Sequence, residues 1–179
     1  DMGRPGSWIS YGPQWAEAGS APFSRYKTYA TEGGIVTPLI IAGPDVQVGE
    51  VHRRYATVMD LAPTFLELAG QAYPSDGSVQ PMLGESLRPV LTGDASSAHS
   101  DEYVTALYYE GRAFIRQGAW KLVNVEPPFS ESDFQLHNLS DDPGEAADLR
   151  QSHPEKHRQL LELWNRTRRE LGILLPVDL

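Results

Sequence analysis

The clearest hydrophobic pattern lies in the second half of the chain. Four runs are rich in β-branched and aromatic residues: Tyr103–Tyr109, Ala113–Gln117, Trp120–Val125 and Phe134–Leu139. Short spacers that contain glycine, Glu110-Gly111 and Gly118-Ala119, separate the first three. Such spacers are typical of antiparallel hairpins. After the turn sequence 140–144, leucines and a tryptophan recur at helical spacing up to Gly172, and Ser152 with Glu155 fits a capping box. We therefore expect a four-stranded antiparallel sheet with the final helix packed across it.

The first half of the chain has a different pattern. Residues 1–34 show no periodicity and suggest an irregular connection. The apolar run Gly34–Ala42, closed by Gly-Pro, is typical of a strand buried on both faces of a parallel sheet, whose neighbouring strands would come from outside this chain. Residues 60–70 have Asp60 as a candidate N-cap and Gly70 as a stop, which predicts a helix, and 84–91 is a candidate short helix.

These patterns divide the chain into two parts. Residues 1–95 are interpreted as the C-terminal end of an α/β domain, and residues 100–179 as a small α+β domain made of the antiparallel sheet and its helix. The second part has the pattern of a domain that folds alone. The first part has one buried-type strand and a long lead-in, so we expect that the start of the protein precedes this sequence.

Composition and charge narrow the classes of function. The formal net charge of −9 argues against an extended surface for nucleic acid or anionic lipid. No apolar run reaches the roughly 20 residues of a membrane helix, so we expect a soluble protein with no membrane partner. The absence of cysteine excludes disulfides and thiolate metal ligands within the chain.

The strongest candidate for chemistry is Lys27. It stands among polar, aromatic and small residues, and Gly33 and Gly34 follow it before the apolar run. We expect the glycines to allow a sharp turn with positive φ, so that the loop holds the ammonium for an anionic partner. An ordinary surface lysine on a loop is the alternative that spacing alone leaves open.

Other candidate residues fit structural roles better. His153 and His157 are four residues apart, but they lie in the charged first turn of the predicted helix, and the five histidines show no short metal-binding spacing. Asp141 and Asp142 belong to an Asp-Asp-Pro-Gly turn. The segment 20–25 nearly matches a Cys/Ser-x-Pro-x-Arg nucleophile signature, but its arginine stands one place too late.

Several motifs together resemble the sulfatase family, in particular the C-terminal portion of bacterial arylsulfatases. They occur in the family's order and span nearly the whole chain: Lys27 with Glu32-Gly33-Gly34, Asp60–Gly70, Gly84–Gly93, Ile115–Val123 and Leu136–Glu145. The resemblance implies an alkaline-phosphatase-like α/β fold in the first part. It also leaves the compartment open between bacterial cytoplasm and periplasm.

The resemblance also implies an activity. In the family, a formylglycine nucleophile attacks the sulfur of a small-molecule sulfate ester, and a calcium ion is held by carboxylates and an asparagine. Nucleophile and calcium ligands would lie upstream, in the missing N-terminal part of the same enzyme. Lys27 matches the family lysine that contacts a sulfate oxygen, which makes it the expected substrate-binding and catalytic residue here. Val36 departs from the arginine of many relatives, which puts a salt bridge at that position in doubt.

Two other functions stay open at this point. Related α/β enzymes of the same fold hydrolyse phosphate or phosphonate esters, and residues upstream of Asp1 would distinguish them from sulfatases. The chain would otherwise be a non-catalytic binding module that presents Trp8 and Trp15 to a partner, in which case it should behave as a cooperatively folded monomer.

Overall fold

The computed structural model describes residues 4–7, 10 and 12–175. The chain forms two compact units, one made of residues 1–37 and 104–179 and the other of residues 38–103. The domain limits predicted from the sequence, 1–95 and 100–179, stay a prediction. None of the described helices has the length and apolar character that crossing a membrane requires.

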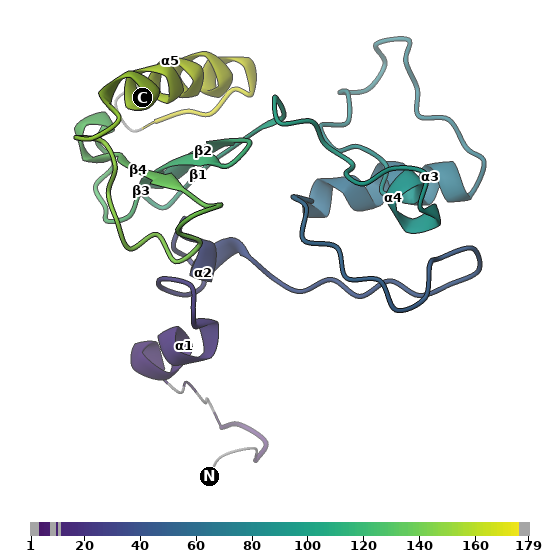
Figure 1. The fold of residues 1–179 in the computed structure, drawn as a ribbon, viewed down its shortest axis with the longest axis horizontal. Coiled ribbons are helices and arrows are strands. Elements are labelled where there is room, and N and C mark those ends of the chain that lie inside the picture. Colours follow the sequence, from purple (N-terminus) through teal and green to yellow (C-terminus); the bar gives the residue numbers. More distant parts are fainter. Residues whose placement is uncertain (1–3, 8–9, 11, 176–179) are drawn as a thin grey trace. The chain divides into compact units, whose positions relative to one another are not determined.

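A four-stranded antiparallel sheet forms the centre of the first unit (Figure 1). Its strands lie in chain order: β1 (Val104–Tyr109), β2 (Arg112–Gln117), β3 (Trp120–Asn124) and β4 (Gln135–Asn138). The β1–β2 turn has positive φ at both Glu110 and Gly111, 48° and 76°, as a type I′ hairpin requires. The short helix η2 (Glu131–Asp133) precedes β4. The predicted antiparallel sheet is confirmed.

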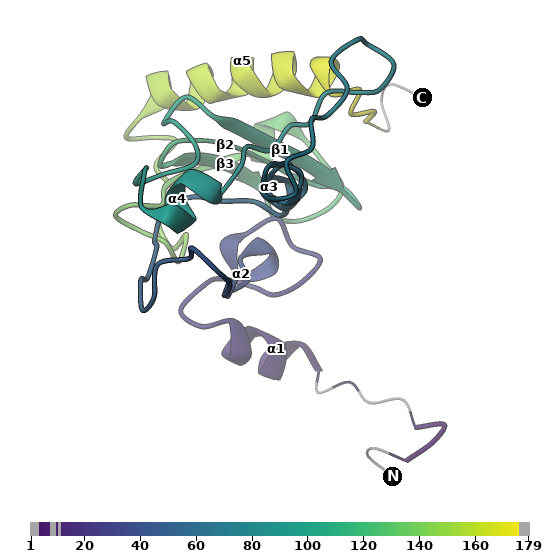
Figure 2. The same ribbon diagram turned by 90° about the vertical axis from the view of Figure 1, so that its right-hand side faces the viewer.

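Helix α5 (Pro154–Glu170) covers one face of this sheet (Figure 2). A buried cluster that includes Leu160, Leu163 and Trp164 of the helix and Ile115 and Leu122 of the sheet joins the two. Burial of each such side chain contributes about 1.5–3 kcal/mol, so this interface accounts for much of the unit's stability. The predicted packing of the final helix is confirmed.

The predicted capping box at the start of α5 is wrong. His153 occupies the N-cap without a side-chain capping bond, and Pro154 begins the helix. The hydroxyl of Ser152 instead donates to the Leu149 carbonyl, 3.1 Å away. The first turn thus relies on the fixed φ of proline rather than on a reciprocal cap.

The opposite face of the sheet is covered by α2 (Glu32–Ile35), which follows α1 (Gly12–Ser20). Phe114 and Val123 point to this face and pack with Ala30, against which Ile35 also lies. Because strand side chains alternate, neighbours of the residues under α5 are directed toward α2. Within the described part of residues 1–34, α1 and most of α2 therefore form where the sequence predicted only irregular structure.

The strand expected over residues 34–42 is absent. Gly34 and Ile35 belong to α2, and residues 36–42 are irregular, with Leu39 and Ile40 53% and 92% exposed. A strand of a parallel sheet needs hydrogen-bonded neighbours, and no described residue pairs with this segment. The α/β part of the predicted fold consequently stays a prediction.

The second unit is built from short helices. The 3-10 helix η1 (Val58–Asp60) leads into α3 (Leu61–Leu68), and α4 (Arg88–Thr92) follows a long irregular segment. Gly70 and Gly93 end the two α-helices with φ of 64° and 84°. Both predicted helices are confirmed, although α4 begins later than expected.

Candidate functional site

Lys27 projects from a constrained loop of the first unit. The residue is exposed, and its ammonium forms no hydrogen bond or ion pair with the described residues. Arg25 and Thr28 on either side of it have φ of 66° and 82°. Positive φ is uncommon outside glycine and especially unfavourable for a β-branched threonine. The surrounding structure therefore holds this loop in one specific conformation.

Gly33 and Gly34 hold the loop by close backbone contact. A Cβ on Gly33 would lie 2.3 Å from the Ser24 carbonyl oxygen, and one on Gly34 would lie 2.2 Å from that of Tyr29. The amide of Gly33 donates to the Ser24 carbonyl at 3.1 Å. Neither glycine has positive φ, so the reason predicted from the sequence is wrong. Glycine is needed here because the two backbone segments touch.

A buried ion cluster fixes α2 to the sheet. The Lys121 ammonium lies 2.7 Å from Oε1 of Glu32 and 2.8 Å from Oε1 of Glu145. Oε2 of Glu145 accepts a 2.6 Å hydrogen bond from the backbone amide of Glu32. The Lys121 side chain is fully buried, and those of both glutamates are nearly so. The sheet and α2, which contains the glycine pair, thus form one continuous support for the Lys27 loop.

The charges of this cluster are balanced. Nη1 of Arg116 lies 3.8 Å from Oε2 of Glu32, so two carboxylates face two cations. The Lys121 ammonium also lies 5.2 Å from the centre of the Phe114 ring. Such pairing offsets the large cost of removing charged groups from water.

Sequence reasoning did not assign a role to Lys121, Glu32 or Glu145, although each lies in a motif that resembles sulfatases. Lys121 stood between apolar residues of a predicted strand, on the face opposite Leu122. A lysine on a covered face of a sheet requires a carboxylate partner, so the position of Lys121 in the strand pattern could have predicted a buried ion pair. Which carboxylate it meets could not be inferred, since Glu32 is 89 positions away.

A surface pocket of about 340 Å³ opens beside Lys27. One wall comes from the Lys27 loop and α2, and the other from the β1–β2 hairpin; the lining residues are Lys27, Thr28, Tyr29, Ala30, Gly34, Ile35, Leu107, Tyr109 and Arg112. None of the described residues lining it is acidic. Two cations and two tyrosines in one pocket are suited to an anionic ring compound.

The other candidate residues have structural partners. His153 Nδ1 lies 3.0 Å from the Ser152 hydroxyl, whereas His157 Nε2 lies 3.3 Å from the Phe134 carbonyl oxygen. Asp142 accepts a hydrogen bond from the Ala147 amide, which agrees with the predicted turn role. Among the described residues, no group of three His, Asp or Glu side chains is placed to hold a metal ion.

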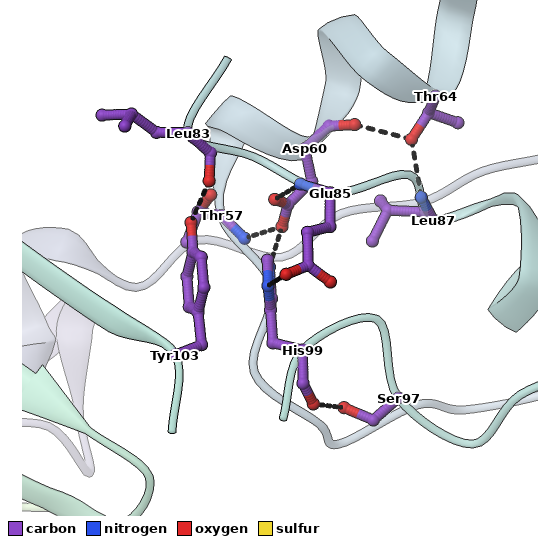
Figure 3. Close-up of polar contacts among 9 residues, drawn as sticks. All are labelled: Thr57, Asp60, Thr64, Leu83, Glu85, Leu87, Ser97, His99 and Tyr103. Atoms are coloured by element: carbon purple, nitrogen blue, oxygen red, sulfur yellow. Dashed lines mark hydrogen bonds and ion pairs between the residues drawn. The ribbon is translucent and has the colours of Figure 1, made fainter. Parts of the chain in front are cut away.

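The second unit contains a separate buried network around Asp60 (Figure 3). Oδ2 of Asp60 accepts hydrogen bonds from the Thr57 amide at 2.6 Å and pairs with Nε2 of His99 at 2.9 Å, while Oδ1 accepts from the Glu85 amide at 3.0 Å. Asp60 occupies the N-cap of α3 without a side-chain capping bond to that helix. The predicted cap is therefore a connection between chain segments.

Neighbouring contacts extend this network (Figure 3). The Thr64 hydroxyl donates to the Asp60 carbonyl and accepts from the Leu87 amide, at 2.6 and 2.8 Å. The His99 ring stacks on Tyr103 with centres 3.7 Å apart. The side chains of Asp60 and His99 are 0% and 2% exposed, so no substrate reaches them. The dyad joins the predicted helix segments and has a structural role.

The family model described as N-sulphoglucosamine sulphohydrolase, C-terminal, matches residues 25–170. The chain belongs to the sulfatase family and corresponds to a C-terminal portion of its members. The match includes the Lys27 loop and all three residues of the ion cluster, Glu32, Lys121 and Glu145. The resemblance predicted from the ordered motifs is confirmed.

Relatives of this sulfatase chain include proteins from fungi and bacteria. An uncharacterized sulfatase of Schizosaccharomyces pombe is 32% identical over 184 residues, covering 99% of the chain and 33% of the relative. The arylsulfatase of Klebsiella aerogenes is 39% identical over 95 residues, or 50% of the chain and 20% of the relative. The chain thus spans a third or less of these relatives.

A solved structure has a similar fold. The crystal structure of Ps i-CgsB superimposes with a TM-score of 0.67 at 25% identity, covering 86% of this chain and 32% of that one. The same protein has also been crystallised in complex with k-i-k-neocarrahexaose, with a TM-score of 0.66 to this chain. The antiparallel sheet and its C-terminal helix are consistent with a sulfatase C-terminal domain.

Proposed function

We propose that this chain is the C-terminal portion of an enzyme that hydrolyses sulfate esters, and that Lys27 binds a sulfate oxygen of the substrate. The observation that carries the proposal is the Lys27 ammonium itself. It forms no ion pair or hydrogen bond with the described residues, and Gly33 and Gly34 fix the loop that carries it. Family membership supplies the reaction class.

The chemistry explains why a fixed cation is useful. Cleavage of a sulfate ester moves negative charge onto the nonbridging and leaving oxygens, and a prearranged ammonium stabilises that charge without reorganising. Lys27 contributes binding and electrostatic stabilisation and need not transfer a proton. A formylglycine would supply the nucleophile and calcium the further positive charge, and we place their residues in sequence upstream of this chain.

The exposed apolar segment after α2 supports a larger fold. Val36, Leu39 and Ile40 are 48%, 53% and 92% exposed, although their pattern is that of a buried strand. We infer that this segment joins a parallel sheet of an alkaline-phosphatase-like domain in the full-length protein. Residues 1–95 would then complete that domain, with 100–179 as the C-terminal α+β domain.

The substrate class has two candidates. The Klebsiella aerogenes relative is an arylsulfatase, which favours an aryl sulfate. The matching family model is named for N-sulphoglucosamine sulphohydrolase, and Ps i-CgsB was crystallised with a neocarrahexaose, which favours a sulfated saccharide. An aryl sulfate is the simpler substrate for a first assay because the released phenol is detected directly.

The test uses the full-length protein with 4-nitrophenyl sulfate. Lys27→Ala should lower kcat/KM about 10²- to 10³-fold, the usual effect of removing one group that stabilises charge in a transition state. Lys156→Ala, which removes a partly exposed lysine on α5, is the matched control and should leave the rate unchanged. Normal activity of a folded Lys27→Ala protein would show that Lys27 does not bind the sulfate.

The same assay separates the alternatives. Faster hydrolysis of 4-nitrophenyl phosphate or phenylphosphonate esters than of the sulfate would favour a phosphoryl substrate. A full-length protein inactive on every ester would favour a binding module. A binding module would present its tryptophans to a partner. Trp15 is 72% exposed, whereas Trp8 lies outside the described residues.

A further inference from the structure

Arg112 is the second cation of the pocket beside Lys27, and the hairpin geometry fixes its position. It begins β2 opposite Tyr109, directly after the tight turn at Glu110 and Gly111. A two-residue type I′ turn leaves little freedom in the register of the residues that flank it. The backbone of Arg112 is therefore held by the sheet rather than by a mobile loop.

Two contacts orient the guanidinium of Arg112. Its Nε donates to the Val125 carbonyl oxygen at 3.1 Å, and its central carbon lies 4.5 Å from the centre of the Tyr29 ring. The cation–π contact and the Nε hydrogen bond together restrict the orientation of the guanidinium fork. The side chain is thus arranged before any ligand arrives.

The terminal nitrogens of this fork have no partner among the described residues. Arg25 provides the contrast. Its guanidinium lies 5.3 Å from the same Tyr29 ring, but its Nη2 pairs with Glu126 at 3.1 Å. Of these two arginines beside one tyrosine, Arg112 lines the pocket with unused donors, and Arg25 is already neutralised.

We propose that Arg112 binds a second anionic group of the substrate, next to the sulfate held by Lys27. This inference rests on the proposed function. The sulfate is already assigned to Lys27, so a second oriented cation in the same pocket is suited to another oxyanion. The arginine fork matches a carboxylate or a second sulfate by paired hydrogen bonds. The substrate class is accordingly a ring that carries the scissile sulfate and one more anionic group.

The rest of the pocket agrees with a ring substrate. Tyr29 and Tyr109 supply flat surfaces, and Leu107 and Ile35 supply aliphatic ones. A hydrogen bond to Glu110 raises the pKa of Tyr109 above its ordinary value of 10.0. A volume of about 340 Å³ lies in the range of small-molecule sites, large enough for one substituted ring.

The test measures binding of stable sulfonates to the full-length protein by calorimetry, which does not depend on catalysis. The probes are benzenesulfonate with one anion, and benzene-1,3-disulfonate and 3-sulfobenzoate with two. We expect the wild type to bind at least one dianion about tenfold or more tightly than benzenesulfonate, as a charged hydrogen bond provides. Comparison of the two dianions distinguishes a sulfate from a carboxylate as the second group.

The variants decide the outcome. Arg112→Gln should abolish the preference for dianions and change the Kd of benzenesulfonate by no more than about twofold. Arg112→Lys should retain part of the preference. Arg25→Gln, which removes the same charge, should retain the whole preference. Equal weakening of all probes by Arg112→Gln, or an equal effect of Arg25→Gln, would overturn the proposal, as would a wild type without preference. Loss of the proposed function is recognised separately, as a wild type that binds dianions but hydrolyses no sulfate ester.

Discussion

The buried ammonium of Lys121 in β3 lies 2.7 Å from the carboxylate of Glu32 in α2. This contact joins the sheet to the short helix that holds the Lys27 loop. Glu145 completes the connection, because it pairs with the same ammonium and accepts the Glu32 amide. A residue without direct access to the pocket thereby determines where the pocket's cation lies.

Removal of the Lys121 charge should strongly destabilise the protein. In Lys121→Met, two buried carboxylates would lose the ammonium that they share, and loss of one buried partner typically costs about 3–5 kcal/mol. Lys121→Arg should cost less, since it keeps the charge. Urea unfolding followed by circular dichroism measures both. Lys156→Met, at a partly exposed position on α5, should change the free energy of unfolding by less than about 0.5 kcal/mol.

Motifs far apart in the sequence meet within each unit. In the first unit, the Glu32-Gly33-Gly34 motif is joined to the motifs that contain Lys121 and Glu145. In the second, Asp60 and Thr64 of one motif bind the amides of Glu85 and Leu87 in another. The order of the motifs indicated the family, and their contacts show what each motif does physically.

The glycine pair should not tolerate even a methyl group. In Gly33→Ala and Gly34→Ala the new Cβ would lie 2.3 and 2.2 Å from carbonyl oxygens of Ser24 and Tyr29, so the Lys27 loop must move. We expect a loss of about 2 kcal/mol or more in the free energy of unfolding, together with weaker binding of benzenesulfonate. Thermal unfolding and calorimetry check the two effects.

Gly19→Ala is the matched control for this prediction. Gly19 lies in α1 and has no atom within 4 Å of an added Cβ. Alanine favours a helix over glycine by about 0.5–1 kcal/mol, so this variant should be neutral or slightly stabilised. If Gly33→Ala behaved like Gly19→Ala, the close backbone contact would not be what requires glycine.

The sequence predicted those parts of the fold in which consecutive elements pack or pair with each other. The four strands pair in chain order, and two-residue turns join the first three, so alternation and turns were sufficient to find them. Helix α5 was recognised from its apolar stripe. The Lys121–Glu32 pair spans 89 positions and has no local signal, and the run 34–42 has no pairing partner among the described residues. Pattern predicts an element, but its partners must be present for the element to form.

Asp60 should be essential to the second unit. Asp60→Ala would leave the amides of Thr57 and Glu85 and the ring of His99 without their acceptor in a buried site. Unsatisfied buried groups cost about 1–3 kcal/mol each, so we expect a loss of at least about 3 kcal/mol. Limited proteolysis should show faster cleavage within 38–103. Asp76→Ala, at an exposed turn, should be cleaved at the wild-type rate.

Burial lowers the pKa of His137 from its ordinary value of 6.5, while Glu145, Asp148 and Asp142 raise it only partly. The residue is 1% exposed and lies opposite Lys121 in the β3–β4 register, so a second positive charge there is unfavourable. Below the ordinary pKa, the unfolded chain binds a proton at His137 that the folded protein does not. The stability contributed by neutral His137 is thus complete above pH 6.5 and is lost as the pH falls toward the lower folded pKa.

This histidine should give the protein a pH-dependent stability that a single substitution removes. Between pH 7.5 and 5, the free energy of unfolding should decrease by up to about 1.4 kcal/mol per pH unit below the ordinary pKa of His137. His137→Gln should flatten that dependence, because glutamine takes up no proton. His52→Gln, at an exposed position, should retain the wild-type slope. Urea unfolding at intervals of half a pH unit measures all three, and an unchanged slope in His137→Gln would assign the titration to another group.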